Sequence, residues 1–182
     1  MALARPGFVL LCAVLSSACA LLSGADSRDP PLLSIAPEIL GERALEQRLV
    51  IRWPGGERAL DAALEIAGGR LRLALMSFGL RVSTLEYDGR TLEETRHLPQ
   101  APVGARMIDD LLLIAAPTAA LRAALPEGWA VAENGRRREI TRDGKTRIVI
   151  QYQYAVDSPW QGRVEFTHRL QGYHLILDSH EL

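Results

Sequence analysis

The chain has 182 residues, of which 48% are hydrophobic and 24% are charged; this composition suits one folded domain with a sizeable core and excludes a disordered chain. Its 21 basic and 22 acidic residues nearly cancel, so there is no broad positive field for nucleic acid and we expect no such partner. The two cysteines, Cys12 and Cys19, both precede the expected domain, which excludes a disulfide framework.

The N-terminal segment has the features of a secretory signal. Arg5 precedes an apolar stretch over 8–15, and no acidic residue occurs before Asp26. This stretch is shorter than the roughly 20 apolar residues that a membrane-spanning helix needs. We therefore expect a cleaved signal peptide over residues 1–18.

The small residues Ser17 and Ala18 directly before Cys19 resemble a bacterial lipobox. In such signals the cysteine becomes acylated and the chain is cut before it. The resemblance implies that the N-terminal lipid anchors the protein to a membrane, and Ala20, where aspartate would retain it at the inner membrane, implies the periplasmic face of the outer membrane of a Gram-negative bacterium. The alternative is an ordinary signal peptide.

A lipidated tether is expected over residues 19–38, because 23–37 is rich in Ser, Gly, Asp and Pro. One domain follows over 39–182. It begins with alternating apolar residues over 45–53, a turn at 54–56, and a segment over 60–66 that fits a strand but also a helical period. Strands over 70–78 and 81–89 meet at the turn Phe78-Gly79-Leu80.

Helical spacing replaces alternation in the middle of the chain. Apolar residues over 107–115 predict a helix, with Asp109 and Asp110 near its start, where the helix dipole favours negative charge. Pro117 ends this helix, and Thr118 is expected to cap a second one that stops at Pro126.

The alternation returns over 136–142, 146–154, 162–169 and 173–178, with turns at Asp143-Gly144 and around residues 170–172. The order of strands, helices and strands predicts a mainly β fold in which one antiparallel sheet curls around one or two helices.

Three stretches make the resemblance more specific: RLALMSFGLRVSTLEYDGRTL over 72–92, PTAALRAALPEGW over 117–129 and WQGRVEFTHRLQGYHLILDS over 160–179. Together they resemble a family of bacterial lipoproteins found in aryl-polyene and related pigment gene clusters. That family is similar to the lipoprotein-localisation (Lol) carrier and outer-membrane receptor. The resemblance implies a curved antiparallel half-barrel with helices lidding a hydrophobic cavity.

The concave face of such a half-barrel could hold an acyl or polyene chain, because alkyl burial makes no directional demands. The alternative is that the same residues form an ordinary core. By analogy with the receptor, Phe78 and Leu80 would contact the bilayer, unless one of them folds inward. The expected lining residues are Leu49, Ile51, Trp53, Leu73, Leu75, Leu85, Ile148, Ile150, Tyr152, Val164, Phe166 and Leu175.

The sequence lacks a nucleophile elbow, a zinc-protease helix and a phosphate-binding glycine loop, so we expect no enzymatic activity and no cofactor. His168, His174 and His180 are evenly spaced, but equal spacing does not make three nitrogens converge, and we expect no metal site. Two functions stay open. The first is an outer-membrane lipoprotein that binds or transfers a hydrophobic ligand, with cargo or a periplasmic carrier protein as partner; the second is a non-binding scaffold for biosynthetic or export proteins.

Overall fold

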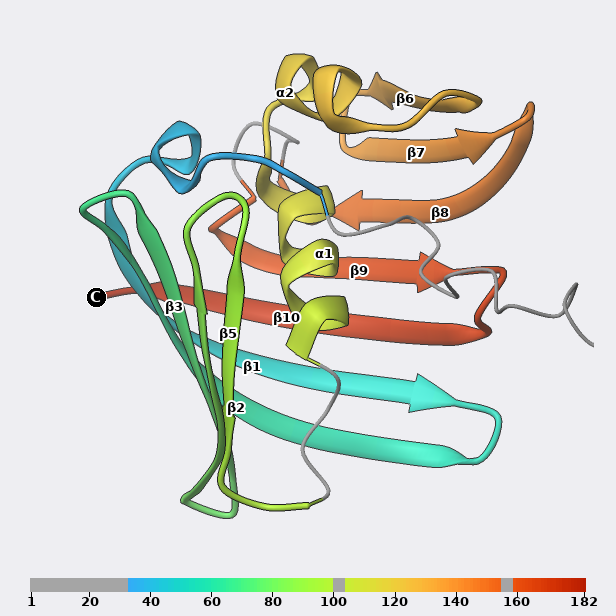
Figure 1. The fold of residues 1–182 in the computed structure, drawn as a ribbon. Coiled ribbons are helices and arrows are strands. Elements are labelled where there is room, and N and C mark those ends of the chain that lie inside the picture. The colour runs from blue at the N-terminus through green and yellow to red at the C-terminus, as the bar shows by residue number, and fades with distance from the viewer. Residues whose placement is uncertain (1–32, 100–103, 155–158) are drawn as a thin grey trace, which may run out of the picture.

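The fold is one ten-stranded antiparallel sheet that curves around a helix (Figure 1). It comes from a computed structural model, which describes residues 33–99, 104–154 and 159–182. The expected signal peptide, the lipidation site Cys19 and most of the expected tether lie outside these residues.

The chain builds the sheet in two halves separated by two helices. A 3-10 turn, η1 (Pro37–Leu40), precedes the first half, which consists of β1 (Arg43–Trp53), β2 (Gly56–Ala67), β3 (Arg70–Ser77), β4 (Leu80–Tyr87) and β5 (Leu92–Arg96). The helices are α1 (Gly104–Ala115) and α2 (Thr118–Ala124). The second half consists of β6 (Trp129–Asn134), β7 (Arg137–Arg142), β8 (Lys145–Tyr152), β9 (Gly162–His168) and β10 (Tyr173–Glu181).

The strand order β5-β4-β3-β2-β1-β10-β9-β8-β7-β6 brings the first and last strands together at the centre of the sheet. Each half is a meander, so all neighbouring strands except β1 and β10 are consecutive in the sequence. The two edges, β5 and β6, are therefore joined by the helical segment. Figure 1 shows α1 crossing the concave side of the curved sheet on this path.

The predicted fold class is confirmed: the sheet is open, strongly curved and antiparallel, with two short helices. Residues 60–66 belong to a strand rather than a helix. Strand β5, whose sequence LEETR is largely charged, was not predicted, and the bounds of β6, whose sequence WAVAEN has two alanines, were not predicted either. Charged residues and alanine are poor strand formers, so these edge strands carry little local signal.

The packed part of the chain starts before the expected domain boundary. Leu33 and Ile35 are buried, with 1% and 4% of their surface exposed, and they join the same core as Leu40. Residues 33–38, which the sequence analysis assigned to the tether, are therefore part of the folded unit. The sequence LSIAP over 33–37 has apolar residues at alternate positions, but the prolines around it indicated a tether.

Two helix-boundary expectations were wrong. Asp109 and Asp110 lie in the middle of α1 and are buried, because the helix begins at Gly104. Helix-dipole stabilisation falls off within the first turn and does not explain them. The N-cap of α2 is Pro117, and no side chain bonds this end of the helix, so Thr118 is its first residue rather than its cap.

The C-terminal end of α1 is capped from the sheet. The Arg138 guanidinium on β7 donates from Nη1 to the carbonyl oxygens of Leu113 and Ile114, at 2.6 and 3.0 Å, and its Nε donates to Glu133 at 2.7 Å. The Tyr152 hydroxyl donates to the same Ile114 oxygen at 2.7 Å. These bonds satisfy carbonyls that a helix end leaves without a partner. They fix this end of α1 against β7 and β8.

We predict that Arg138→Met lowers the free energy of unfolding by about 2 to 4 kcal/mol, because it removes a buried charge that partners Glu133 and two helix carbonyls. Urea unfolding followed by circular dichroism measures this. The matched control is Arg137→Met: this neighbour pairs with Glu139 on the exposed side of β7 and should change stability by less than about 0.5 kcal/mol. Equal effects of the two substitutions would contradict the capping role.

Candidate functional site

Helix α1 fills the concave face of the sheet. All its residues other than Arg106 are buried, as expected for a helix that is surrounded rather than lying on a surface. A void of about 20 Å³ lies between the described part of α1 and the sheet. This space is of the order of one water molecule and cannot hold an acyl chain. The void is lined by Gln47, Leu49, Leu73, Met107, Asp110, Leu111, Ile114, Leu175 and Leu177.

The residues expected to line a cavity lie almost entirely in this packed interior. Ile51 is half-buried near the end of β1. Trp53, at the last position of β1, is 42% exposed, and its indole lies against Gly55 and Gly56. The other ten are buried: Leu49, Leu73, Leu75, Leu85, Ile148, Ile150, Tyr152, Val164, Phe166 and Leu175.

A buried carboxylate attaches the middle of α1 to β10. The Tyr173 hydroxyl is 2.8 and 2.7 Å from the two carboxylate oxygens of Asp110, to which it donates its hydrogen bond. Burial raises the pKa of the Asp110 carboxyl to about 7; the Tyr173 bond and the charge of Arg106 oppose this rise, and Asp109 adds to it. Asp110 therefore changes charge near neutral pH while it is buried between α1 and the sheet.

The neighbouring carboxylate attaches α1 to the N-terminal segment. The Leu33 N–H donates to Asp109 Oδ1 at 3.1 Å. The Tyr87 hydroxyl on β4 donates to the Leu33 carbonyl and accepts the Ile35 N–H at 3.2 Å. Residues 33–35 are therefore held jointly by α1 and β4, at the point where the described chain begins.

A third polar contact lies near the start of α1. Arg106 Nη1 is 3.5 Å from His168 Nε2 at the end of β9, and the His168 ring stacks on Tyr173 with 5.2 Å between ring centroids. At the same end of α1, a side chain at Gly104 would collide with Leu85 of β4 and Glu94 of β5, so glycine allows this close approach. His174 and His180 lie apart from this contact, on β10.

The β3–β4 turn exposes an aromatic residue at a strained position. Phe78 and Gly79 have φ values of 51° and 75°, as a type I′ turn requires, and the Phe78 side chain is fully exposed. The β7–β8 turn has the same backbone form, with φ values of 50° and 70°, but uses Asp143-Gly144, which suits it. A left-handed Phe costs on the order of 1 kcal/mol, so folding alone does not explain this choice.

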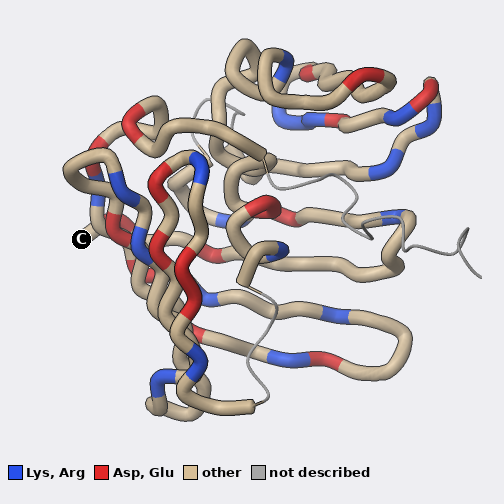
Figure 2. Tube along the Cα trace, viewed as in Figure 1, with Lys and Arg blue, Asp and Glu red and all other residues tan. Residues whose placement is uncertain are grey.

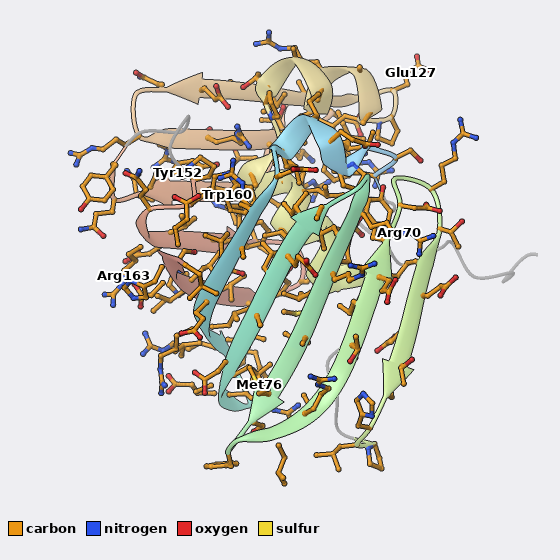
Figure 3. The ribbon with its side chains drawn as sticks, turned by 90° about the vertical axis from the view of Figure 1, so that its left-hand side faces the viewer. Arg70, Met76, Glu127, Tyr152, Trp160 and Arg163 are labelled. Atoms are coloured by element: carbon orange, nitrogen blue, oxygen red, sulfur yellow. The ribbon has the colours of Figure 1, made fainter. Side chains whose placement is uncertain are left out.

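Leu80, which follows Gly79, is 64% exposed. Neither Phe78 nor Leu80, the two residues predicted to contact the bilayer, therefore folds inward. Five of the eight large exposed hydrophobic residues in the described chain lie at the end of the sheet that carries the β1–β2, β3–β4 and β9–β10 turns. We call this end of the sheet the hairpin rim, and its exposed hydrophobic residues are Trp53, Phe78, Leu80, Leu98 and Leu170. The rim follows the twist of the sheet, with the β3–β4 turn at the bottom of Figure 1 and the β1–β2 turn at the right. Figure 3 shows the labelled Met76 at this lower end and Arg70 at the opposite end of β3.

Among the described residues, no group of His, Cys, Asp or Glu is arranged to hold a metal ion. No helix in the described ranges is both long and apolar enough to cross a bilayer.

A family model described as "Protein of unknown function (DUF3261)" matches residues 44–181, from the second residue of β1 to the last of β10. The chain belongs to this family. No curated protein matches it. The DUF3261 match therefore covers all ten strands and both helices, including α1 with its two buried aspartates, while residues 33–43 precede it.

Sequence reasoning missed the polar contacts of α1 in this DUF3261 protein. A signal was present: Asp109 and Asp110 interrupt the apolar residues 107–115, and an acidic pair inside an apolar helix is costly unless it has partners. Their partners Tyr173 and Leu33 come from two distant segments, and only the fold brings them to α1.

We predict that acidification stabilises the protein through Asp110. Because its folded pKa of about 7 lies above the ordinary value of 3.8, its contribution to stability is greatest below pH 4 and is lost as the pH rises to about 7. Between pH 5.5 and 8 the loss should be roughly 2 kcal/mol.

Thermal melts across this pH range measure the effect. Asp110→Asn should flatten the dependence, since the amide oxygen can still accept the Tyr173 bond without ionising. Asp61→Asn on the exposed face of β2 is the control and should leave the pH dependence unchanged. A parent and an Asp110→Asn variant with the same pH profile would rule out this role of Asp110.

Proposed function

We propose that this protein is an outer-membrane lipoprotein that receives or hands on a hydrophobic ligand during envelope assembly. Acylated Cys19 anchors it, and the Phe78–Leu80 turn contacts the bilayer. The ligand is an acyl chain, a lipoprotein or an aryl-polyene lipid, and its hydrophobic part lies on the concave face. A periplasmic carrier protein delivers or collects the ligand. The chain performs no chemistry on it.

The exposed Phe78 is the observation that carries the membrane contact. An aromatic side chain with no covering atoms, next to exposed Leu80, is favourable when it can enter lipid, where burial of each such side chain contributes about 1.5 to 3 kcal/mol. The type I′ turn projects Phe78 beyond the strands, and Leu80 is the first residue of β4. Together with an N-terminal lipid, this gives two separate attachments to one bilayer.

The ligand site requires α1 to leave the concave face, because the void beneath it is only about 20 Å³. The two buried carboxylates of α1 support this movement. A helix that served only as core would bury apolar side chains throughout, whereas α1 buries Asp109 and Asp110, whose desolvation offsets part of its apolar packing. An alkyl chain that replaces α1 recovers about 25 cal/mol per Å² of apolar surface without needing hydrogen bonds.

The second candidate is a membrane-anchored scaffold that binds no ligand and holds partner proteins. The filled concave face favours it, because an interior packed around α1 is what a permanent core has. The two candidates differ in whether α1 can be displaced, and therefore in whether a hydrophobic molecule enters.

We predict that Phe78→Ser with Leu80→Ser weakens binding to lipid vesicles at least about tenfold, which corresponds to the loss of about 1.4 kcal/mol or more. Cosedimentation of a chain beginning at residue 20 measures the turn without the lipid anchor. The control is Tyr154→Ser with Leu182→Ser: these residues are also exposed but follow β8 and β10 at the opposite end of the sheet. Vesicle binding that falls equally in both pairs would show that the turn has no special part in it.

We predict that native mass spectrometry of the protein extracted in mild detergent detects a bound hydrophobic molecule in addition to the mass of the acylated chain. Release of this molecule at raised collision energy, and its identification as an acyl lipid or polyene, would support the ligand-binding candidate. A protein that carries only its own anchor, and that takes up none of a fluorescent fatty acid, favours the scaffold.

A further inference from the structure

The β1–β2 hairpin extends past the end of the β3–β4 hairpin and leaves a free strand edge. In the β2–β3 register the last pair is Asp61 with Met76, whereas β2 continues to pair with β1 as far as Gly56. The β3–β4 pair bends at an irregularity between Leu75 and Met76, just before this point. Over residues 56–60, β2 therefore pairs with β1 on one side and with no described strand on the other side.

The register identifies which backbone groups face the free side. Trp53 pairs with Gly56 across a two-residue turn, so the even-numbered residues of β2 exchange their hydrogen bonds with β1. The odd-numbered residues face β3, as the pair Ala67 and Arg70 across the next two-residue turn requires. Beyond Asp61, the N–H and C=O groups of Ala59 and Glu57 point outward, and no strand in the described chain pairs with them.

A groove of about 530 Å³ lies beside this edge. Its apolar surface comes from Ala59 and Leu60 on β2, from Phe78 and Val82 around the β3–β4 turn, and from Leu98 after β5. Leu60 and Val82 are core residues, so the floor of the groove is continuous with the interior.

The charges around the groove balance. It is lined by two arginines, Arg48 and Arg58, and two acidic residues, Glu57 and Asp61. Arg48 lies 3.4 Å from Asp61, and Glu57 pairs with Arg52. Figure 2 shows basic residues (blue) and acidic residues (red) next to each other at this part of the β1–β2 hairpin. An occupant therefore needs no net charge.

We propose that this groove binds an extended, uncharged polypeptide segment of a partner protein, which adds as a short strand to the free edge of β2. A peptide satisfies the outward N–H and C=O groups of Ala59 and Glu57 and places alternate apolar side chains on Leu60 and Val82, whereas Phe78 remains available to the bilayer. An acyl chain in the same groove would bury these backbone groups without partners, at a cost of about 1 to 3 kcal/mol for each. The observations therefore favour a peptide over a lipid. This site is separate from the concave face and does not depend on the proposed ligand binding.

The test uses the full chain in lipid nanodiscs and a displayed library of random twelve-residue peptides. Peptides enriched on the parent are measured by fluorescence anisotropy against two variants at one position. Ala59→Pro removes the outward N–H without touching the β1 ladder, so it should weaken binding at least about tenfold. Ala59→Ser keeps the N–H and should bind within about twofold of the parent. Thermal melts establish that both variants are folded.

Methylating alternate backbone nitrogens of an enriched peptide gives a second measurement that needs no folded variant. One methylation register should abolish binding and the other should leave it largely intact, as pairing along one edge requires. The proposal is overturned if no peptide is enriched, if Ala59→Pro binds the peptides as well as Ala59→Ser does, or if both registers of methylation behave alike. It is also overturned if a fluorescent fatty acid displaces the peptides and keeps its affinity for Ala59→Pro, since the groove would then bind acyl chains.

Discussion

The fold depends on the passage of α1 across the concave face. Because β1 pairs with β10 at the centre of the sheet, the two meanders end at opposite edges, and the chain has to travel from β5 to β6. The shortest path lies inside the curve of the sheet. A helix on that path meets apolar side chains from both halves at once, which accounts for the burial of nearly its whole surface.

This position explains the polar contacts along α1. A helix surrounded by a sheet needs partners for its terminal carbonyls, and Arg138 and Tyr152 supply them from β7 and β8. Asp110 and Asp109 are different, since a helix does not need carboxylates in its middle. They bond to Tyr173 and to Leu33, and so attach α1 to β10 and to the N-terminal segment. Burial of ionisable groups lowers the net stability of this contact, and this supports the proposal that a ligand displaces α1.

The sequence predicted the architecture because strand alternation and turn residues are local signals. The hairpins around Pro54-Gly55, Phe78-Gly79 and Asp143-Gly144 were all visible in this way. Polar edge strands such as β5 could not be predicted in this way, and neither could the burial of Leu33 and Ile35. Their packing depends on segments far along the chain. For the same reason, the concave residues were identified but not their partner: alternation shows which face of a strand is apolar, and it does not show whether a ligand or α1 covers that face.

We propose that a hydrophobic ligand displaces α1 from the concave face. Hydrogen–deuterium exchange of the protein with and without a saturating fatty acid tests it most directly, because exchange reports local opening element by element. The account predicts that the amides of α1 exchange at least about tenfold faster when the fatty acid is bound, while those of the central strands β1 and β10 keep their protection. Binding of the fatty acid with α1 still fully protected would contradict it.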